Sequence, residues 1–335
     1  MPSTIHDVAR LAGVSPSTVS KYINGGSLRP KYRQKVQQAI EQLDFKPNSV
    51  ARSLKSNRTY SVGVILPSLS NTFCATIISA FEKELQKMGY GVLICDCDEN
   101  PEAELPCAQF LIDKKVDGIV SMPLSDSPEF FSLAQDNNIP IVIIDQNPTD
   151  KACDIVLIDN MDASYTAVRH LIEYGHEKIA IICGDPERFT ASERLNGYLK
   201  ALKDHNIPIQ KDYIRHCNYR KASSYSEVKK LMQLPDPPTA IFASSYDLTI
   251  GSITALNELG LSLGETISLI GFDSLILSEI ISPSLSMVTQ PMEEIGQRAA
   301  ALLLRRILGD YSDFPSREQL KTTFISANSV KCLNN

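Results

Sequence analysis

Residues 4–24 read TIHDVARLAGVSPSTVSKYIN, and this stretch predicts two short helices joined by a tight turn. Thr4 is a suitable N-cap, and Asp7 lies in the electropositive first turn of the helix that follows. Gly13 can adopt the left-handed backbone conformation that ends a helix. Ser15 can cap a second helix, in which Pro16 takes the first position, where its missing N–H costs nothing. Apolar residues recur in the first helix at helical spacing, at Ile5, Val8, Ala9 and Leu11.

The second helix is expected to have an apolar face and a polar face made of small side chains. Val19 and Ile23 fall on the apolar side. The outer side carries Ser17, Thr18, Ser20 and Lys21. A helix–turn–helix with this kind of second helix fits the major groove of DNA. An ordinary helical hairpin is the alternative interpretation, because small helix pairs are common.

Two further helical segments are predicted before residue 60. The first covers residues 30–43, and its apolar residues Val36, Ile40 and Leu43 point to a small shared core. The second lies in FKPNSVARSLKSNRTY, residues 45–60, where Asn48 is a competent N-cap and residues 49–55 form one short helix. This last helix has few residues to bury and is too short to be stable alone.

Charge is divided unevenly along the chain. Residues 1–60 contain ten Lys and Arg against three Asp and Glu, which gives a net charge of +7. Since the whole chain carries −6, residues 61–335 carry −13. A basic head on an acidic body is expected when only the head meets the phosphates of nucleic acid. Taken alone, the asymmetry is also compatible with an incidental distribution of charge.

Residues 61–335 alternate apolar, β-branched runs with amphipathic segments. The strand-like runs cover residues 62–66, 91–95, 118–122, 141–144, 155–158, 179–183, 240–243 and 268–272. Helical segments between them include residues 76–88, 163–174, 193–205 and 248–259. This rhythm predicts parallel sheets covered by helices on both faces. Eight or more strands favour two lobes over a single sheet.

Several other classes of protein lack support in the sequence. No apolar run resembles a signal peptide or reaches the length of a membrane span, so a cytoplasmic protein without a membrane is expected. The eight cysteines show neither CxxC pairs nor Cys/His ligand spacing, which favours buried reduced thiols over disulfides or zinc. Phosphate-binding GxxxxGK, GxSxG and HExxH motifs are missing as well. We therefore expect a binding protein without metal or cofactor, not an enzyme.

Three strings, TIHDVARLAGVS, TVSKYING and KPNSVARSL, follow one another in the first 54 residues. They resemble the headpiece and hinge helix of the LacI (lactose-repressor) family of bacterial transcription regulators, and the resemblance continues through almost the whole chain. It implies an all-α helix–turn–helix headpiece and an α/β, two-lobed domain like that of periplasmic sugar-binding proteins. The implied parts are a DNA-binding domain over residues 1–47, a hinge helix and linker over 48–60, and an effector-binding and dimerisation domain over 61–335. Its N-lobe takes residues 61–159 plus 290–320, and its C-lobe takes 160–289 plus 321–331.

The resemblance also implies how DNA is bound, by a homodimer on a pseudo-palindromic, double-stranded operator. Base reading falls to Pro16, Ser17 and Lys21. Proline offers only apolar contact, for instance to a thymine methyl, and Lys21 lacks the bidentate fork of the more usual arginine. Leu54 would be a minor-groove wedge, with an ordinary linker leucine as the alternative, and the small Ala51 would let the hinge backbone approach. The complete implied DNA-binding set is Thr4, Ser15, Pro16, Ser17, Thr18, Ser20, Lys21, Asn24, Asn48, Ser49, Ala51, Arg52, Leu54 and Lys55.

Family correspondence places a small-molecule effector between the lobes, at the carboxyl ends of the strands. The implied effector-binding residues are Asn71, Phe73, Asp145, Arg194, Tyr219, Ser245, Asp273 and Gln290. Each of the main residues also has a structural interpretation. Asp145 could cap the next helix, Phe73 could belong to the core, and Arg194 could be a surface ion-pair partner of little energetic value.

The implied set also indicates the chemistry of the effector. Asp and Arg together suit vicinal hydroxyls, and aromatic faces suit the apolar face of a sugar ring. A sugar of the ribose type is favoured, a purine is a weaker alternative, and a multiply charged anion is disfavoured. Two positions depart from the family pattern. Ser245 and Tyr246 replace the usual Asn-Asp, with acid shifted to Asp247, and Ala327 replaces an arginine in the last strand.

Together these features predict a cytoplasmic, sequence-specific transcription repressor that a sugar controls allosterically. In the proposed mechanism the effector reorients the lobes and so changes whether the paired hinges fold on DNA. Two alternatives remain open. A free sugar-binding protein for transport would use the same body but needs an export signal and no basic head. A sugar-modifying enzyme with a DNA-binding head would need a catalytic constellation.

Overall fold

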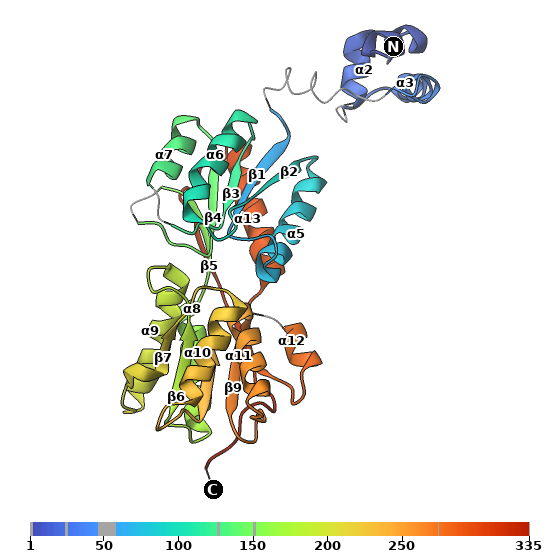
Figure 1. The fold of residues 1–335 in the computed structure, drawn as a ribbon. Coiled ribbons are helices and arrows are strands. Elements are labelled where there is room, and N and C mark those ends of the chain that lie inside the picture. The colour runs from blue at the N-terminus through green and yellow to red at the C-terminus, as the bar shows by residue number, and fades with distance from the viewer. Residues whose placement is uncertain are drawn as a thin grey trace. The chain divides into compact units, whose positions relative to one another are not determined.

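The computed structural model describes residues 3–23, 26–45, 58–125, 128–149, 152–273 and 275–334. It divides into two compact units, Met1–Tyr60 and Ser61–Asn335, which we call the headpiece and the body (Figure 1). The two units are described separately below.

The described part of the headpiece contains three helices, α1 (Ile5–Ala12), α2 (Pro16–Ile23) and α3 (Pro30–Gln42). The predicted start of α1 is confirmed, because Thr4 and Asp7 form a reciprocal capping box. Its end is confirmed as well, since Gly13 takes a left-handed conformation with φ +66°. The side chains that pack together are Val8, Ala9, Ala12, Val19, Val36, Ala39 and Phe45, with Ile5, Val14, Tyr22, Ile23, Ile40 and Leu43 partly buried around them.

One apolar residue of the first helix does not join this core. Leu11 is 47% exposed, and Ala12 takes the neighbouring core position instead. Leu11 shares the helical spacing of the apolar residues but lies beside the buried stripe of α1, which runs through positions 5, 8, 9 and 12. The expected short helix over residues 49–55 lies outside the described residues. The same holds for the implied DNA-binding residues Asn24, Asn48, Ser49, Ala51, Arg52, Leu54 and Lys55.

The first lobe of the body is built on a six-stranded sheet with the order β11-β5-β4-β3-β1-β2. Its strands are β1 (Ser61–Leu66), β2 (Gly91–Asp96), β3 (Ile119–Ser121), β4 (Ile141–Ile144), β5 (Asp154–Ile158) and β11 (Arg317–Leu320). All neighbours pair in parallel. The helices of this lobe are α5 (Thr72–Lys87), η1 (Pro101–Ala103), α6 (Glu104–Asp113), α7 (Pro128–Asp136) and α13 (Met292–Ile307).

The second lobe repeats this plan with the order β12-β10-β9-β8-β6-β7. Its strands are β6 (Ile179–Cys183), β7 (Ile214–His216), β8 (Ala240–Ala243), β9 (Ser268–Asp273), β10 (Ser286–Thr289) and β12 (Thr323–Ile325). Only the pairing of β10 with β12 is antiparallel among these described strands. Its helices are α8 (Asn160–Glu173), α9 (Phe189–Asp204), η2 (Lys211–Tyr213), α10 (Lys221–Met232), α11 (Tyr246–Glu258) and α12 (Leu275–Ile280).

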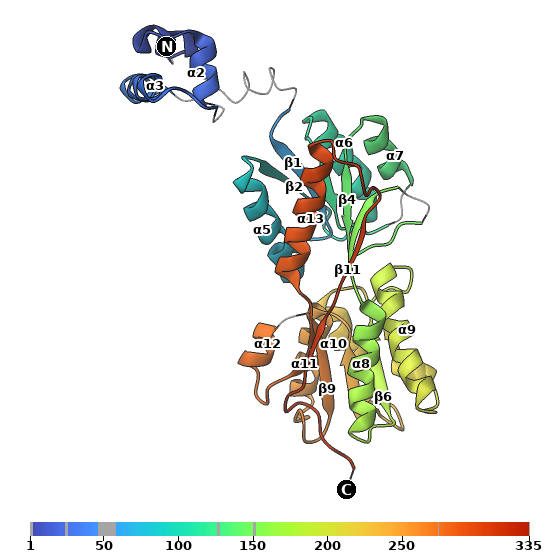
Figure 2. The same cartoon turned by 180° about the vertical axis from the view of Figure 1, so that it is seen from behind.

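The chain passes between the two sheets three times, after β5, after β10 and after β11 (Figure 2). After the second passage, α13 packs against α5, where Gly296 lies so close to the Ile77 carbonyl that a Cβ would collide with it. Two of the connecting segments, those after β5 and after β11, are hydrogen-bonded to each other. The Thr322 amide and hydroxyl both donate to Asp159 Oδ1 at 2.9 Å. These connecting segments form the floor between the lobes.

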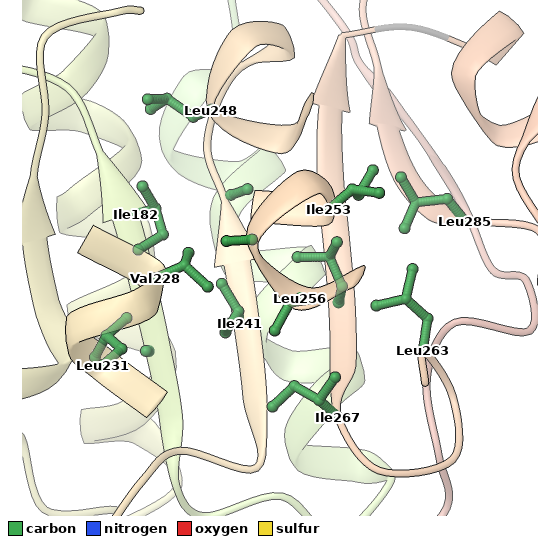
Figure 3. Close-up of a cluster of buried hydrophobic side chains, with 14 of the residues drawn as sticks. Ile182, Val228, Leu231, Ile241, Leu248, Ile253, Leu256, Leu263, Ile267 and Leu285 are labelled. Carbon is green, nitrogen blue, oxygen red and sulfur yellow. The ribbon is translucent and has the colours of Figure 1, made fainter. Parts of the chain in front are cut away.

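Each lobe has its own apolar core. In the second lobe, buried side chains fill the space between the sheet and helices α10 and α11 (Figure 3). Val228 and Leu231 approach from α10, while Ile241 and Leu269 lie on the strands beneath. Among the residues that the structure describes, no helix has both the length and the apolar character needed to cross a membrane.

Candidate functional site

The outer face of α2 presents most of the residues expected to read bases. Pro16, Ser17 and Lys21 are exposed, as is Ser15 just before the helix. Ser15 Oγ accepts a hydrogen bond from the Thr18 amide at 3.3 Å, so the expected N-cap of the second helix is present. Thr18 and Ser20 are partly buried. Thr4 is exposed, and its hydroxyl donates to the Asp7 carboxylate at 2.7 Å as part of the cap.

Basic side chains also cover the described part of the headpiece. Arg29, Lys31, Arg33 and Lys35 are exposed on or beside α3. Arg10 pairs with Asp7 on α1, yet its side chain remains 79% exposed. Long cationic side chains on an exposed surface can neutralise phosphates, which sets the salt dependence of DNA binding but not its sequence preference.

In the body, the residues implied as effector contacts converge on one cavity of about 80 Å³ between the lobes. They come from the carboxyl ends of strands in both sheets and from the helices that follow. All eight line this cavity, namely Asn71, Phe73, Asp145, Arg194, Tyr219, Ser245, Asp273 and Gln290. We call this space the cleft. Parallel sheets concentrate polar side chains at this edge, because each strand ends there and a helix begins.

Arg194 is the most firmly held of these residues. It is only 3% exposed, so the alternative of a surface ion pair is wrong. Its Nε donates to Asn160 Oδ1 at 2.7 Å, and its Nη1 donates to the Ser244 carbonyl at 2.6 Å. The guanidinium also stacks over the Phe272 ring, 4.0 Å from the ring centroid. These contacts fix the orientation of the planar fork before a ligand arrives.

Asp273 and Gln290 form a second oriented pair at the ends of β9 and β10. Gln290 Nε2 donates to Asp273 Oδ1, and the Tyr246 amide donates to Asp273 Oδ2 at 2.8 Å. The carboxylate therefore caps α11, although that helix precedes it in the chain. Because a carboxylate accepts only, the amide nitrogen of Gln290 must face it, and the amide oxygen Oε1 is directed elsewhere. This Oε1 is buried without a hydrogen-bond partner among the described residues.

Asn71 and Phe73 supply the first-lobe wall of the cleft. Asn71 is the N-cap of α5, and its Oδ1 accepts from the Phe73 amide at 2.9 Å. Phe73 is 9% exposed and lines the cavity, so it serves both the packing of α5 and the wall. Tyr219 lies on the opposite side, where the absence of a side chain at Gly184 leaves room for its ring.

Two carboxyl groups in the cleft have perturbed titration. Burial raises the pKa of Asp145 to about 7, against the opposing effect of the Arg194 charge. Burial also raises the pKa of Asp247, and the charges of Asp273 and Glu99 add to this rise. Asp145 has φ +63° at the end of β4, a conformation that Asp tolerates better than most residues. Among the described residues β4 leads through a loop to β5 and not to a helix, so the alternative of Asp145 as the cap of the next helix is wrong.

Several cleft residues were not anticipated from the sequence. Glu99 and Arg188 line it from opposite lobes, together with Pro67, Cys74, Met122 and Thr190. Arg188 Nη2 lies 2.9 Å from Glu99 Oε2, and its guanidinium sits 5.1 Å from the centroid of the Tyr219 ring. A second hollow of about 420 Å³ shares Glu99, Arg188 and Tyr219 with the cleft. The positions of Glu99 after β2 and of Arg188 before α9, near strand ends, are the sequence signal from which both could have been predicted to line the cleft.

The two departures from the family pattern have different outcomes. Ser245 and Tyr246 lie at the start of α11, and the shifted acid, Asp247, does line the cleft. Ala327 instead exchanges backbone hydrogen bonds with the Ser286 hydroxyl behind the sheet. Within the described part of the chain, no group of three or more His, Cys, Asp or Glu side chains could hold a metal ion.

Both parts of the chain match known protein families. Residues 4–48 match the family of bacterial regulatory proteins of the lacI type, and residues 59–329 match the periplasmic binding proteins and sugar binding domain of the LacI family. The HTH-type transcriptional repressor PurR of Actinobacillus pleuropneumoniae is 35% identical over 334 residues, 99% of each chain.

Solved structures agree as well. The lac repressor dimer bound to operator and the anti-inducer ONPF has a TM-score of 0.87 at 25% identity, covering 99% of this chain and all of that one. A LacI family regulator from Enterococcus faecium with bound ribose has a TM-score of 0.74 at 26% identity, covering 82% of this chain and all of that one. The chain therefore belongs to the LacI family of bacterial transcription regulators.

Proposed function

We propose that this protein is a cytoplasmic transcription repressor that binds a pseudo-palindromic operator as a homodimer and responds to a small ligand in the cleft. The observation that carries the proposal is the joint presence of an exposed, capped α2 and a polar interlobe cavity in one chain. In this scheme the DNA-binding domain is residues 1–47, the hinge helix and linker are 48–60 and the effector-binding and dimerisation domain is 61–335.

Base reading is assigned to Pro16, Ser17 and Lys21, with the hinge residues named above adding minor-groove contacts. Lys21 is exposed on the outer face of α2, as a side chain must be to enter the major groove. The match to an operator-bound lac repressor dimer supports both the DNA partner and the dimer. A free transport protein would not need the basic headpiece, and the cleft residues have structural partners rather than the arrangement of a nucleophile with its base.

A ligand acts on DNA binding through the relative arrangement of the lobes. The cleft is lined from both lobes, so a ligand that contacts Asn71 and Phe73 on one side and Arg194 and Asp273 on the other stabilises one arrangement. Differential affinity for two arrangements is what shifts the population between them. Ribose is bound by one structural relative, which supports a polyhydroxylated ligand of sugar type.

The DNA half of this proposal is tested by selecting operators from a random palindromic library and measuring binding by fluorescence anisotropy at several salt concentrations. The wild type should prefer one palindrome over scrambled DNA by at least about 1000-fold. Lys21→Ala should reduce that preference, while Lys31→Ala, which removes the same charge from α3, should weaken both kinds of DNA alike. Equal binding to selected and scrambled DNA would refute the proposal.

A further inference from the structure

The charges that line the cleft are unbalanced. Four carboxyl groups and two guanidinium groups face it, so the cleft has more acid than base. The acidic residues are Glu99, Asp145, Asp247 and Asp273, and the basic residues are Arg188 and Arg194. Surface acids would be screened by water and salt, but this cavity lies between two lobes, where such an excess matters more.

The arginines are already engaged within the protein. Arg188 is paired with Glu99 at 2.9 Å across the mouth of the cleft, which cancels one acid against one base. Arg194 donates to Asn160 and to the Ser244 carbonyl, so part of its guanidinium group is already hydrogen-bonded within the protein. What remains is one guanidinium against three carboxyl groups.

Gln290 presents an unpaired hydrogen-bond acceptor to the cleft. It is 8% exposed, and its buried Oε1 has no partner among the described residues while its Nε2 is held by Asp273. An amide oxygen in this orientation can only accept. Ser245 is 7% exposed and its buried hydroxyl also has no described partner, and a hydroxyl can either donate or accept. A buried acceptor left unpaired costs free energy, so Gln290 favours a ligand that donates a hydrogen bond.

Asp145 gives the clearest indication that the ligand carries a positive charge. Its carboxyl group faces the charges of Arg194, Arg188 and Asp273, and the Cys74 thiol lies near enough to be affected by it. The two positive charges do not offset burial and the neighbouring negative charge. A cation beside Asp145 would stabilise its ionised form, whereas a neutral hydroxyl would do so only weakly.

We propose that the physiological ligand of the cleft is a small polyhydroxylated molecule that carries one protonated amine, as amino sugars and amino polyols do. The amine lies beside Asp145, and the hydroxyl groups bond to Gln290, Asp273 and Arg194. The proposal rests on the assignment of the cleft as the ligand site. It goes further by assigning a positive charge to the ligand, which neither the fold nor the polar character of the cavity requires.

The test uses matched pairs of compounds that differ only in the amine. D-glucosamine and D-glucose, D-galactosamine and D-galactose, and 1-amino-1-deoxysorbitol and sorbitol are titrated into the full-length protein by calorimetry, after a thermal-shift screen. For at least one pair, the amine should bind at least about tenfold more tightly than its parent, the value of one partly buried charge interaction. The N-acetyl derivatives, which lose the charge and add an acetyl group, should bind no more tightly than the parents.

Proton release gives a second readout that shape alone would not produce. Since burial raises the pKa of Asp145 to about 7, this group is partly protonated at neutral pH. A bound cation lowers that pKa, so the amine should release protons on binding at pH 7, and the binding enthalpy should change with the ionisation enthalpy of the buffer. Asp145→Asn should abolish this release and reduce the preference for the amine to about twofold or less. Asn tolerates the left-handed backbone at this position, and Asp136→Asn, at an exposed site on α7, is the matched control.

Two results would overturn the proposal. One is a screen in which no amine raises the melting temperature, and the other is that in every pair the neutral parent binds at least as tightly as its amine. Neither result touches the assignment as an operator-binding repressor, because that is measured separately with DNA. Loss of specific DNA binding with retained amine binding would overturn the repressor assignment alone.

Discussion

Arg188 and Glu99 join the two lobes of the body, with 2.9 Å between guanidinium nitrogen and carboxylate oxygen. The residues are 89 positions apart in the chain and lie in loops of different lobes. Their side chains are 25% and 19% exposed, and the Tyr219 ring lies under the guanidinium. A partly buried ion pair between two lobes stabilises only those lobe arrangements in which its charged atoms stay within bonding distance.

We expect a double-mutant cycle on Glu99→Gln and Arg188→Gln to give a coupling of about 1 kcal/mol in the free energy of unfolding of the body. The measurement is urea denaturation of the four proteins followed by circular dichroism. The control pair is Lys200 and Asp204, which lie 2.8 Å apart on the surface of α9 and should couple more weakly. A coupling for Glu99 and Arg188 no larger than that of the control would show that the pair does not join the lobes energetically.

A buried ion pair in the first lobe should be far more sensitive. Arg306 on α13 donates to Asp154 through Nε at 2.7 Å and Nη2 at 2.9 Å, and neither side chain has exposed surface. Asp154→Asn leaves the guanidinium buried without its main partner and should cost about 3–5 kcal/mol in the free energy of unfolding.

Urea denaturation of this variant is compared with that of Asp113→Asn, at an exposed site on α6, which should unfold close to the wild-type midpoint. A wild-type midpoint for Asp154→Asn would contradict the assigned role. Arg306 also bonds to Asp310 and Asp313 in the loop before β11, so a rearrangement that uses only these partners would produce that outcome.

His176 should make the stability of the second lobe fall in acid. It is 1% exposed, with Nδ1 2.8 Å from the Thr239 hydroxyl and Nε2 3.0 Å from the Lys331 carbonyl. Burial lowers its pKa from the ordinary value of 6.5. The unfolded chain therefore binds the proton more readily, and this contribution to stability is present above about pH 6.5 and is lost as the pH falls toward the folded-state pKa.

The pH dependence of wild-type stability does not isolate His176, because Glu104, Asp145 and Asp247 have raised pKa values and their contributions to stability change with pH in the opposite direction. The wild type is therefore compared with a His176 variant. His176→Gln should flatten the loss of stability between pH 7 and 5, measured by urea unfolding at each pH. Ser268→Ala removes a hydroxyl 2.9 Å from Nε2 but keeps the titrating ring, so it should lower stability and retain the wild-type slope. An unchanged slope in His176→Gln would disprove the linkage.

The contact between α5 and α13 predicts the sign of a glycine substitution. Ala is favoured over Gly by about 1 kcal/mol inside a helix, but a Cβ at position 296 would collide with the Ile77 carbonyl and come within 2.9 Å of the Phe81 amide. Gly296→Ala should therefore destabilise the body by about 1–3 kcal/mol, as overpacked cores do. Gly91→Ala, where a Cβ would meet no atom within 4 Å, is the control in thermal unfolding. Stabilisation by Gly296→Ala would show that the helices can move apart without cost.

The fully buried strands could be predicted from sequence because their apolar runs are continuous. The runs at 141–144, 179–183 and 240–243 coincide with β4, β6 and β8, and five others are correct to within two residues at either end. The strands β7, β10, β11 and β12 were missed. They have three or four residues each, and β11, with the sequence REQL, is largely polar and partly exposed at the edge of its sheet. Such strands are defined by their neighbours, which a local pattern does not contain.

The cleft shows the same division between local and distant information. The sequence predicts strand-end positions for three cleft residues that follow apolar runs, Asn71, Asp145 and Asp273. The resemblance to the family supplied the other implied cleft residues. Glu99 and Arg188 were missed because their pairing depends on how the two lobes approach each other. The start of α5 at Thr72, four residues before the predicted start, follows from the cap that Asn71 provides.

The three passages between the lobes have a consequence for how the protein is made on the ribosome. The first sheet includes β11, and α5 has its packing partner in α13, so the first lobe is incomplete until nearly the whole chain has emerged. The headpiece needs only residues near its own core, from Val8 to Phe45, to complete its packing. Newly synthesised chains should thus present a folded α2 well before they have a cleft, and a premature stop after residue 290 would leave a headpiece attached to a body that no ligand can control.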